Sequence, residues 1–286
     1  MKRISYTLNM MRSSWEVLKA EKQLMLFPLI SGVCCLLVLL SFGLPLWANG
    51  FPNPEQWRQR PLLYYGLLFL FYFMNYFIVV FFNSAVIACA ILRMRGGEPT
   101  LSTGIHAALS RLPQILGWAL VAASVGLILR ALENLARRRG NWVGQIVAGL
   151  LGMAWSVVTF LVVPILVVEK KGPFEAVKES AALLRKTWGE QLVGNFGFGL
   201  VFFLLALASL VPLLLGFLIV HAAMPLGVLL IAIGLIYLIG LAVVQSTLQT
   251  IFQAAVYLYA RDNRAPKGFD ESDLSSAMAP SPRPSE

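Results

Sequence analysis

Charged residues are scarce in this sequence. Asp, Glu, Lys and Arg together make up 13% of its 286 residues, whereas 58% of the residues are hydrophobic and the mean hydropathy is +0.74. Water-soluble domains carry about 25% charged residues. The composition therefore excludes an ordinary water-soluble domain and indicates an integral membrane protein.

Cysteine and histidine are scarce too, with three Cys and two His in the chain. Cys34, Cys35 and Cys89 lie inside apolar runs, where they are typical small packing residues, so a disulfide framework is excluded. His106 and His221 stand apart from other residues of metal-binding type, so we expect no metal site. Because no nucleophile, base and metal occur together, we expect neither an enzyme nor a bound cofactor.

Long apolar runs are abundant, and they cover residues 23–54, 61–92, 112–129, 140–168 and 191–260. A helix needs roughly 20 apolar residues to cross the hydrocarbon, so the first four runs form one span each. The last run divides at a turn over residues 220–227, where Pro225 begins a new helix. Kinks are expected at Pro164 and Pro212. The sequence predicts an all-α, polytopic membrane helix bundle whose six transmembrane helices cover about residues 24–47, 62–92, 112–130, 143–168, 191–219 and 226–259.

The distribution of basic residues predicts the orientation of these spans. The N-terminal segment, the loops after the second and fourth spans, and the C-terminal segment hold most of the 23 Lys and Arg residues. Basic loops stay on the cytoplasmic side, so both termini are predicted to be cytoplasmic, with the Arg cluster at residues 137–139 as a local exception. The net charge of +9 is thus a topological signal and an attraction to anionic lipid headgroups. Nucleic-acid binding is not expected, because the basic residues are divided among short loops.

A short pattern recurs before long apolar runs: "MMRSSW" at residues 10–15 and "LLRKTW" at residues 183–188. In the surrounding segments, 3–20 and 173–188, apolar residues recur every three or four positions and form one helical stripe. A fainter copy covers residues 100–111, and Pro99 and Pro173 suit helix starts. Residues 1–260 are therefore predicted to form one membrane domain of three repeats, each an interfacial amphipathic helix followed by two spans. The apolar faces of the three helices either rest on lipid or cap the bundle.

The composition of residues 261–286 changes to Ser, Pro and acidic residues, which predicts a disordered cytoplasmic tail.

Polar side chains inside the spans form the first candidate site. The most ordered set lies in the last span, where glutamines recur every four residues, and asparagines of other spans are placed to face it. The set comprises Gln245, Gln249, Gln253, Asn75, Asn83 and Asn195. These amides either link helices through hydrogen bonds or line a polar path. No Asp or Glu lies in the middle of a span, which argues against an ion-coupled transporter.

The second candidate set is a predicted interface layer on the cytoplasmic side. "RMRGGEP" at residues 93–99 predicts a sharp turn, since a phosphate-binding loop needs a preceding strand and a Lys-Ser/Thr pair that are missing. Glu169, at the end of the fourth span, is predicted to pair with Arg93 or Arg185. The layer comprises Arg93, Gly96, Gly97, Glu169, Gly172, Pro173, Arg185 and Trp188.

Two segments carry a family resemblance. "FFNSAVIACAILRMRGGEPTLSTGIHAAL" (residues 81–109) and "VVPILVVEKKGPFEAVKESAALLRKTWGE" (residues 162–190) resemble a bacterial family of six-span integral membrane proteins of unknown function. More distantly, the pattern of Glu169, Gly172, Ala176 and Ser180 is similar to the membrane domain of some glycerophosphodiester phosphodiesterases and to Yip-type membrane proteins. The resemblance implies a bacterial cytoplasmic (inner) membrane location. It implies no hydrolytic residues, because the catalytic barrel of those phosphodiesterases has no counterpart in this sequence.

We therefore expect a non-enzymatic integral membrane protein that takes part in envelope or lipid organisation or serves as a scaffold. The expected partners are membrane lipids, with anionic headgroups at the cytoplasmic face, and a further membrane protein. The alternative is a channel or transporter for a small solute or lipid, with the glutamines as the wall of its path.

Overall fold

The computed structural model describes residues 2–48, 61–138, 140, 142–187 and 196–269. These residues form α-helices and one short 3-10 helix, and no strand occurs among them. The elements are α1 (Lys2–Ala20), η1 (Lys22–Met25), α2 (Leu26–Ala48), α4 (Pro61–Met94), α5 (Leu101–Leu109), α6 (Leu112–Arg138), α7 (Trp142–Val158), α8 (Val162–Glu169), α9 (Pro173–Thr187), α10 (Phe196–Leu207), α11 (Leu210–Ile219) and α12 (Met224–Asp262). The predicted all-α fold is confirmed.

Six helical stretches are long and apolar enough to cross a membrane, as the sequence predicts, and they indicate a multi-pass membrane protein. They are Lys22–Pro45, Leu62–Met94, Leu112–Arg137, Trp142–Glu169, Val201–Ile219 and Met224–Asp262. Helices also form at each of the three segments expected to lie at the interface, as α1, α5 and α9. Their relation as three repeats stays a prediction. Of the expected C-terminal tail, residues 270–286 lie outside the described residues, while Phe269 is 7% exposed and packs into the core.

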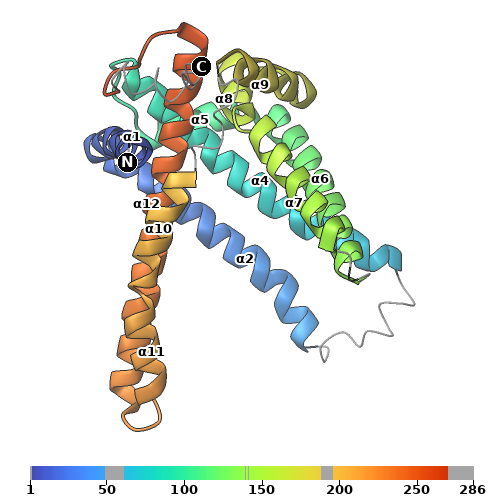
Figure 1. Cartoon of the computed structure of the whole chain (residues 1–286), viewed down its shortest axis with the longest axis vertical. Coiled ribbons are helices and arrows are strands. Elements are labelled where there is room, and N and C mark those ends of the chain that lie inside the picture. Colours follow the sequence, from blue (N-terminus) through green and yellow to red (C-terminus); the bar gives the residue numbers. More distant parts are fainter. Residues whose placement is uncertain (1, 49–60, 139, 141, 188–195, 270–286) are drawn as a thin grey trace, which may run out of the picture.

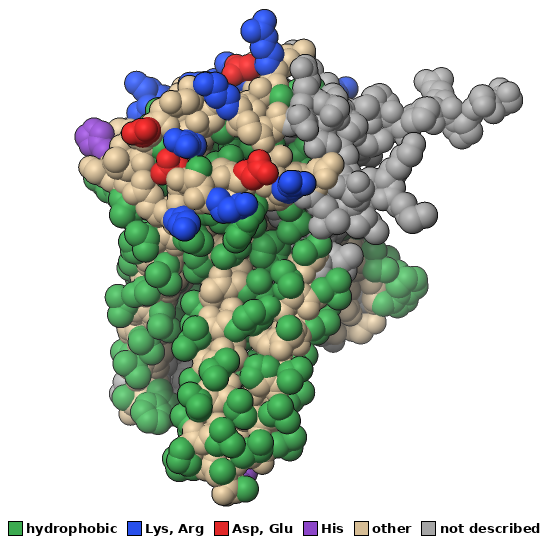
Figure 2. Space-filling model, turned by 90° about the vertical axis from the view of Figure 1, so that its left-hand side faces the viewer, with side chains coloured by type: hydrophobic (Ala, Val, Ile, Leu, Met, Phe, Trp, Pro, Cys, Tyr) green, Lys and Arg blue, Asp and Glu red, His purple; other side chains and the backbone are tan. Residues whose placement is uncertain are grey.

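The molecule has one charged end from which apolar legs extend. At this end, which we call the charged head, α1, α5, α9 and the C-terminal end of α12 come together (Figure 1). One leg is made of α10, α11 and α12, another of α4, α6 and α7, and α2 runs between them (Figure 1). Figure 2 shows Lys, Arg, Asp and Glu side chains gathered on the head and hydrophobic side chains covering the legs. This division matches a polar layer at a membrane surface above spans that face lipid.

The core lies directly beneath the charged head. Val86 of α4, Ile165 of α8 and Ile251 of α12 are all 0% exposed and belong to one hydrophobic cluster. Farther from the head the packing thins, and Phe217 of α11 and Ile236 of α12 are 68% and 69% exposed. Side chains of the legs are therefore left for the hydrocarbon, whereas the head end is packed like a soluble domain.

The fourth predicted span is broken into α7 and α8 at residues 159–161. Pro164 has no N–H to donate to the carbonyl of Phe160, four residues earlier, so the regular helix is interrupted there. The buried Ser180 hydroxyl of α9 accepts a hydrogen bond from the Leu161 N–H at 3.1 Å. A break also separates α10 from α11 at residues 208–209, just before Pro212. Both prolines thus act as the sequence predicts.

The turn predicted at residues 220–227 joins α11 to α12, with Pro225 in the first turn of α12. The two helices touch backbone to backbone near this turn. A Cβ atom added at Gly227 would lie 2.5 Å from Val220 Cα and 2.8 Å from Gly216 O. Only glycine allows such an approach, and in membranes close backbone contact is a main source of helix association.

Gly227→Ala is therefore expected to separate α11 from α12 and to lower the free energy of unfolding by about 1–3 kcal/mol, the usual effect of overpacking. Gly240→Ala in the same helix is the matched control, because a Cβ there meets nothing within 4 Å. Thermal unfolding of both variants in detergent micelles is the measurement. Equal stability of the two variants would contradict this account of the hairpin.

Candidate functional site

The glutamines of α12 do not form one connected site. The Gln253 amide donates a hydrogen bond to the carbonyl oxygen of Phe160, the group that Pro164 leaves without its helical donor. Gln253 therefore supplies a hydrogen-bond donor at the break between α7 and α8 and links α12 to this break. Gln245 is half-buried and Gln249 is exposed.

The predicted asparagines are also dispersed. Asn75 donates from Nδ2 to the Phe71 carbonyl in its own helix at 2.8 Å. Asn83 is half-buried in α4, and Asn195 lies outside the described residues. Among the predicted polar residues that the structure describes, Gln253 thus links α12 to the break between α7 and α8, and that bond serves a structural purpose.

The role of Gln253 can be separated from a solute path by paired substitutions. Gln253→Leu removes the hydrogen bond to the Phe160 carbonyl in an apolar setting and should lower stability by about 1–2 kcal/mol. Gln249→Leu, on the exposed face of the same helix, should change it by less than about 0.5 kcal/mol. Thermal unfolding in detergent measures both, and a loss at Gln249 as large as that at Gln253 would contradict the assignment.

A charged network at the base of the head joins α8, α9 and α12. We call it the Glu169 cluster: Glu169, Lys171, Glu179, Tyr257 and Arg261. The Glu169 side chain is only 9% exposed, and its carboxylate accepts a hydrogen bond from the Tyr257 hydroxyl at 3.0 Å. Lys171 Nζ lies 2.8 Å from Glu169 and 3.2 Å from Glu179. Arg261 lies 3.5 Å from Glu169 and 3.1 Å from Glu179. Two cations are matched by two anions, which a nearly buried carboxylate requires.

The predicted partners of Glu169 are wrong. Arg93 lies 3.3 Å from Glu21 instead, and Arg185 is exposed on α9. Lys170 adopts a left-handed conformation with φ of 58° at the end of α8, which turns the chain so that Lys171 returns to Glu169. Because α12 continues to Asp262, its last turns bring Tyr257 and Arg261, four residues apart on one face, to the same carboxylate. The i, i+4 spacing of Tyr257 and Arg261 is the sequence pattern that could have placed them together on one helix face.

The other residues of the predicted interface layer shape the backbone. Gly96 has φ of 92°, a left-handed turn conformation, and a Cβ at Gly97 would lie 2.7 Å from Leu92 Cδ1. Pro173 begins α9 and packs on α6 at Gly117, while a Cβ at Gly172 would meet nothing within 4 Å. Trp188 lies outside the described residues. The sharp turn predicted for "RMRGGEP" is present at residues 95–97.

Contacts within the Glu169 cluster shift the pKa values of Lys171 and Glu179. Hydrogen bonding to Glu169 raises the pKa of Lys171 above its ordinary value of 10.5. Hydrogen bonding from Lys171, with the nearby Arg261 charge, lowers the pKa of Glu179 below its ordinary value of 4.5. The contribution of Glu179 to stability is therefore complete above pH 4.5 and is lost as the pH falls through the lowered pKa. That of Lys171 is complete below pH 10.5 and is lost as the pH rises through the raised pKa.

Glu179→Gln should therefore lower stability at neutral pH by about 0.5 kcal/mol, a modest effect because the pair is partly exposed. The difference from the unaltered protein should stay constant in the neutral range and shrink as the pH falls below 4.5. Unfolding midpoints measured as a function of pH test this. Glu98→Gln, at an exposed site, is the control, and a difference that grows toward low pH would contradict the assignment.

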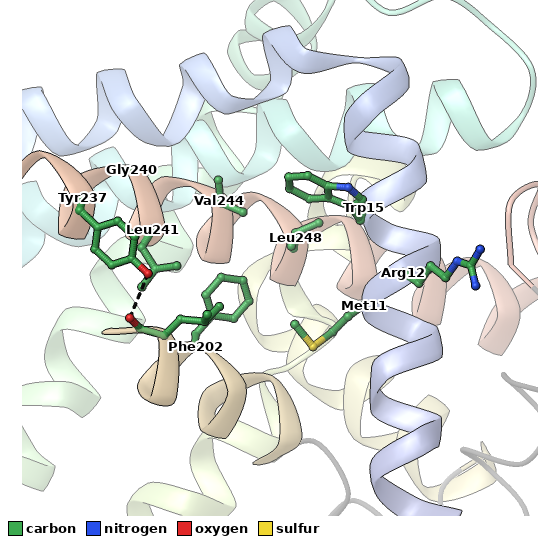
Figure 3. A pocket seen from close by; sticks show the side chains of 10 residues that line it. Met11, Arg12, Trp15, Phe202, Tyr237, Gly240, Leu241, Val244 and Leu248 are labelled. Atoms are coloured by element: carbon green, nitrogen blue, oxygen red, sulfur yellow. Dashed lines mark hydrogen bonds between the residues drawn. The ribbon is translucent and has the colours of Figure 1, made fainter. Parts of the chain in front are cut away.

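An apolar groove of about 640 Å³ runs between α10 and α12 and ends at α1. Tyr237 marks one end, where its hydroxyl donates to the Leu205 carbonyl at 3.0 Å (Figure 3). Met11 and Trp15 of α1 point toward α12 at the other end, whereas the Arg12 side chain extends away from it (Figure 3). The lining consists of Met11, Arg12, Trp15, Phe202, Leu205, Tyr237, Gly240, Leu241, Val244 and Leu248. The predicted glutamines are absent from this lining, and sequence reasoning missed the groove because its residues look like ordinary lipid-facing side chains.

In the described part of the chain, no three or more His, Cys, Asp or Glu side chains lie close enough together to hold a metal ion. No protein with a curated description matches this chain. Residues 62–268 match the family of unknown function DUF6159. Because the match covers more than half of the 286 residues, the protein belongs to this family.

Proposed function

We propose that this protein is a non-enzymatic, multi-pass protein of the bacterial cytoplasmic membrane that binds and organises lipid at the cytoplasmic face. In this proposal the charged head faces the cytoplasm, together with both termini, as the distribution of Lys and Arg favours. The distant likeness to the phosphodiesterase membrane domain and to Yip-type proteins stays a prediction of the same kind.

The apolar groove is the observation that carries the proposal. Its α12 residues extend from Tyr237 to Leu248, a distance of about 16 Å at 1.5 Å rise per residue. One leaflet of hydrocarbon is about 15 Å thick. The groove thus has the length of one leaflet, and its lining is almost wholly apolar, so it suits one acyl chain of a phospholipid in the leaflet beneath the head.

The end of the groove at α1 suits a lipid headgroup. Trp15 is the kind of side chain that concentrates at headgroup level in membranes. Arg12 is 81% exposed in its side chain, and its pair with Glu16 at 3.6 Å is a weak surface pair, so the guanidinium remains open to a phosphate. Anionic headgroups are the expected partners on this account. The exposed apolar faces of α11 and α12 also leave surface for a further membrane protein.

A channel or transporter is the alternative function. It requires a polar path past the glutamines, but Gln253 donates a hydrogen bond to the Phe160 carbonyl, and none of Gln245, Gln249 and Gln253 lines the apolar groove. No specific observation favours the alternative over lipid binding. A water-accessible path along these glutamines would restore it.

Gly240→Leu tests the proposal by filling the groove. A Cβ at Gly240 meets nothing within 4 Å, so the new side chain enters the groove without a clash at its base. Displacing about two methylenes of an acyl chain, at about 0.8 kcal/mol each, should lower lipid retention roughly tenfold. Native mass spectrometry of the purified, detergent-washed protein counts the retained phospholipids.

Gly149→Leu in α7 is the matched control, since its Cβ position is equally open and lies in another leg. The unaltered protein and this control should retain phospholipid alike. Retention by Gly240→Leu at the level of the unaltered protein would overturn the groove as the lipid site.

A further inference from the structure

A second pocket, of about 470 Å³, lies in the charged head where the C-terminal ends of α4 and α12 meet. We call it the basic pocket. Arg95 and Arg264 line it together with Asp262, and Met94 and Leu258 supply apolar wall. Its volume falls within the range of about 300–1,000 Å³ that is typical of small-molecule sites. The proposed lipid function makes no use of it.

The chain is folded back on itself to form this pocket. α12 ends at Asp262 and is capped by Asn263, which has φ of 52°, and the next residues return across the end of α4. Lys267 approaches the Gly96 turn so closely that its Nζ lies 3.0 Å from the position of a Cβ on Gly96. Phe269 is 7% exposed and anchors the returning segment in the core. Arg95 and Arg264 thereby line one space, and Lys267 lies beside the turn that follows Arg95.

These three cations differ from Lys171, Arg261 and Arg93, which form ion pairs in the head. Lys171 and Arg261 are matched by Glu169 and Glu179, and Arg93 by Glu21. Within the described part of the chain, Arg95, Arg264 and Lys267 form no ion pair.

The local charge balance favours an anion. Asp262 contributes one negative charge, and each of the two helix C-termini contributes about half a charge. With Lys267 beside the pocket included, these offset about two of the three positive charges, so about one positive charge remains in this neighbourhood. An arginine guanidinium group can donate two parallel hydrogen bonds to one phosphate. The carbonyl oxygens at the end of a helix do not offer this paired arrangement of acceptors.

We propose that the basic pocket binds a phosphate group, carried either by a soluble phosphorylated molecule or by a lipid headgroup. Arg95 and Arg264 hold the phosphate oxygens from two sides, and Lys267 supplies further positive charge. Asp262 opposes the bound anion and so limits its affinity.

The test uses the full chain in detergent micelles, titrated with sodium phosphate at constant ionic strength kept by sodium chloride. Phosphate should raise the unfolding midpoint of the unaltered protein, because a ligand that binds the folded state stabilises it. Arg264→Gln should weaken the apparent phosphate affinity roughly tenfold, the effect of losing one charge-assisted contact. Arg185→Gln, at an exposed arginine of α9 outside the pocket, is the control and should leave the affinity unchanged.

Asp262→Asn gives a test of opposite sign. Removing the carboxylate that lines the pocket should tighten phosphate binding, whereas a purely structural role for these charges predicts no gain. Should Arg264→Gln fail to fold, Lys267→Gln provides the same comparison. Phosphate that stabilises no better than chloride, or equally in the unaltered protein and in Arg264→Gln, would overturn the proposal.

Reconstitution distinguishes the two sources of the phosphate group. In phosphatidylcholine nanodiscs, phosphate should stabilise the protein as it does in detergent. If phosphatidylglycerol nanodiscs abolish that response, the pocket holds a lipid headgroup; if they leave it intact, the pocket takes a soluble phosphate. Both results support the site, and neither depends on retention of lipid in the apolar groove.

Discussion

The nearly buried carboxylate of Glu169 constrains the whole charged head. A carboxylate that is 9% exposed must be met by cations and donors, or the cost of removing it from water stays uncompensated. Its partners come from the turn before α9 and from the last turns of α12. One side chain therefore fixes the relative positions of three elements that are distant in sequence. The tight turn at Lys170 and the last turns of α12 place these partners at the carboxylate.

The legs depend on this arrangement because they have little core of their own. Phe217 and Ile236 face outward, as suits side chains in contact with hydrocarbon. In lipid there is no hydrophobic drive to bring spans together, so association relies on close packing and on polar links. The Gly227 contact serves the first purpose between α11 and α12, and the Gln253 bond to Phe160 serves the second between α12 and the break after α7. The groove and the basic pocket lie along the same helix, at positions that these contacts define.

Hydropathy was sufficient to predict the helices, since six runs of the right length leave little freedom in a membrane. Pro164 and Pro212 were enough to predict interruptions, because a missing N–H acts locally. The partner of the freed Phe160 carbonyl was beyond sequence reasoning, as Gln253 is 93 residues away along the chain. For the same reason the choice of Glu21 for Arg93, and of Arg261 for Glu169, followed from packing and could not be read from spacing alone. The groove was hidden because Leu241 and Leu248 are indistinguishable in sequence from side chains that face bulk lipid.

The length of α12 has a mechanical consequence. Its 39 residues extend for about 58 Å, nearly twice the thickness of the hydrocarbon, without an internal proline. The helix starts at the hairpin with α11, passes the apolar groove at mid-length and ends among the charges of the head (Figure 1). It is therefore one continuous helix that connects these three parts of the molecule. Because the helix is continuous, the positions of Arg261 and Asp262 in the charged head are tied through one element to the hairpin at its opposite end.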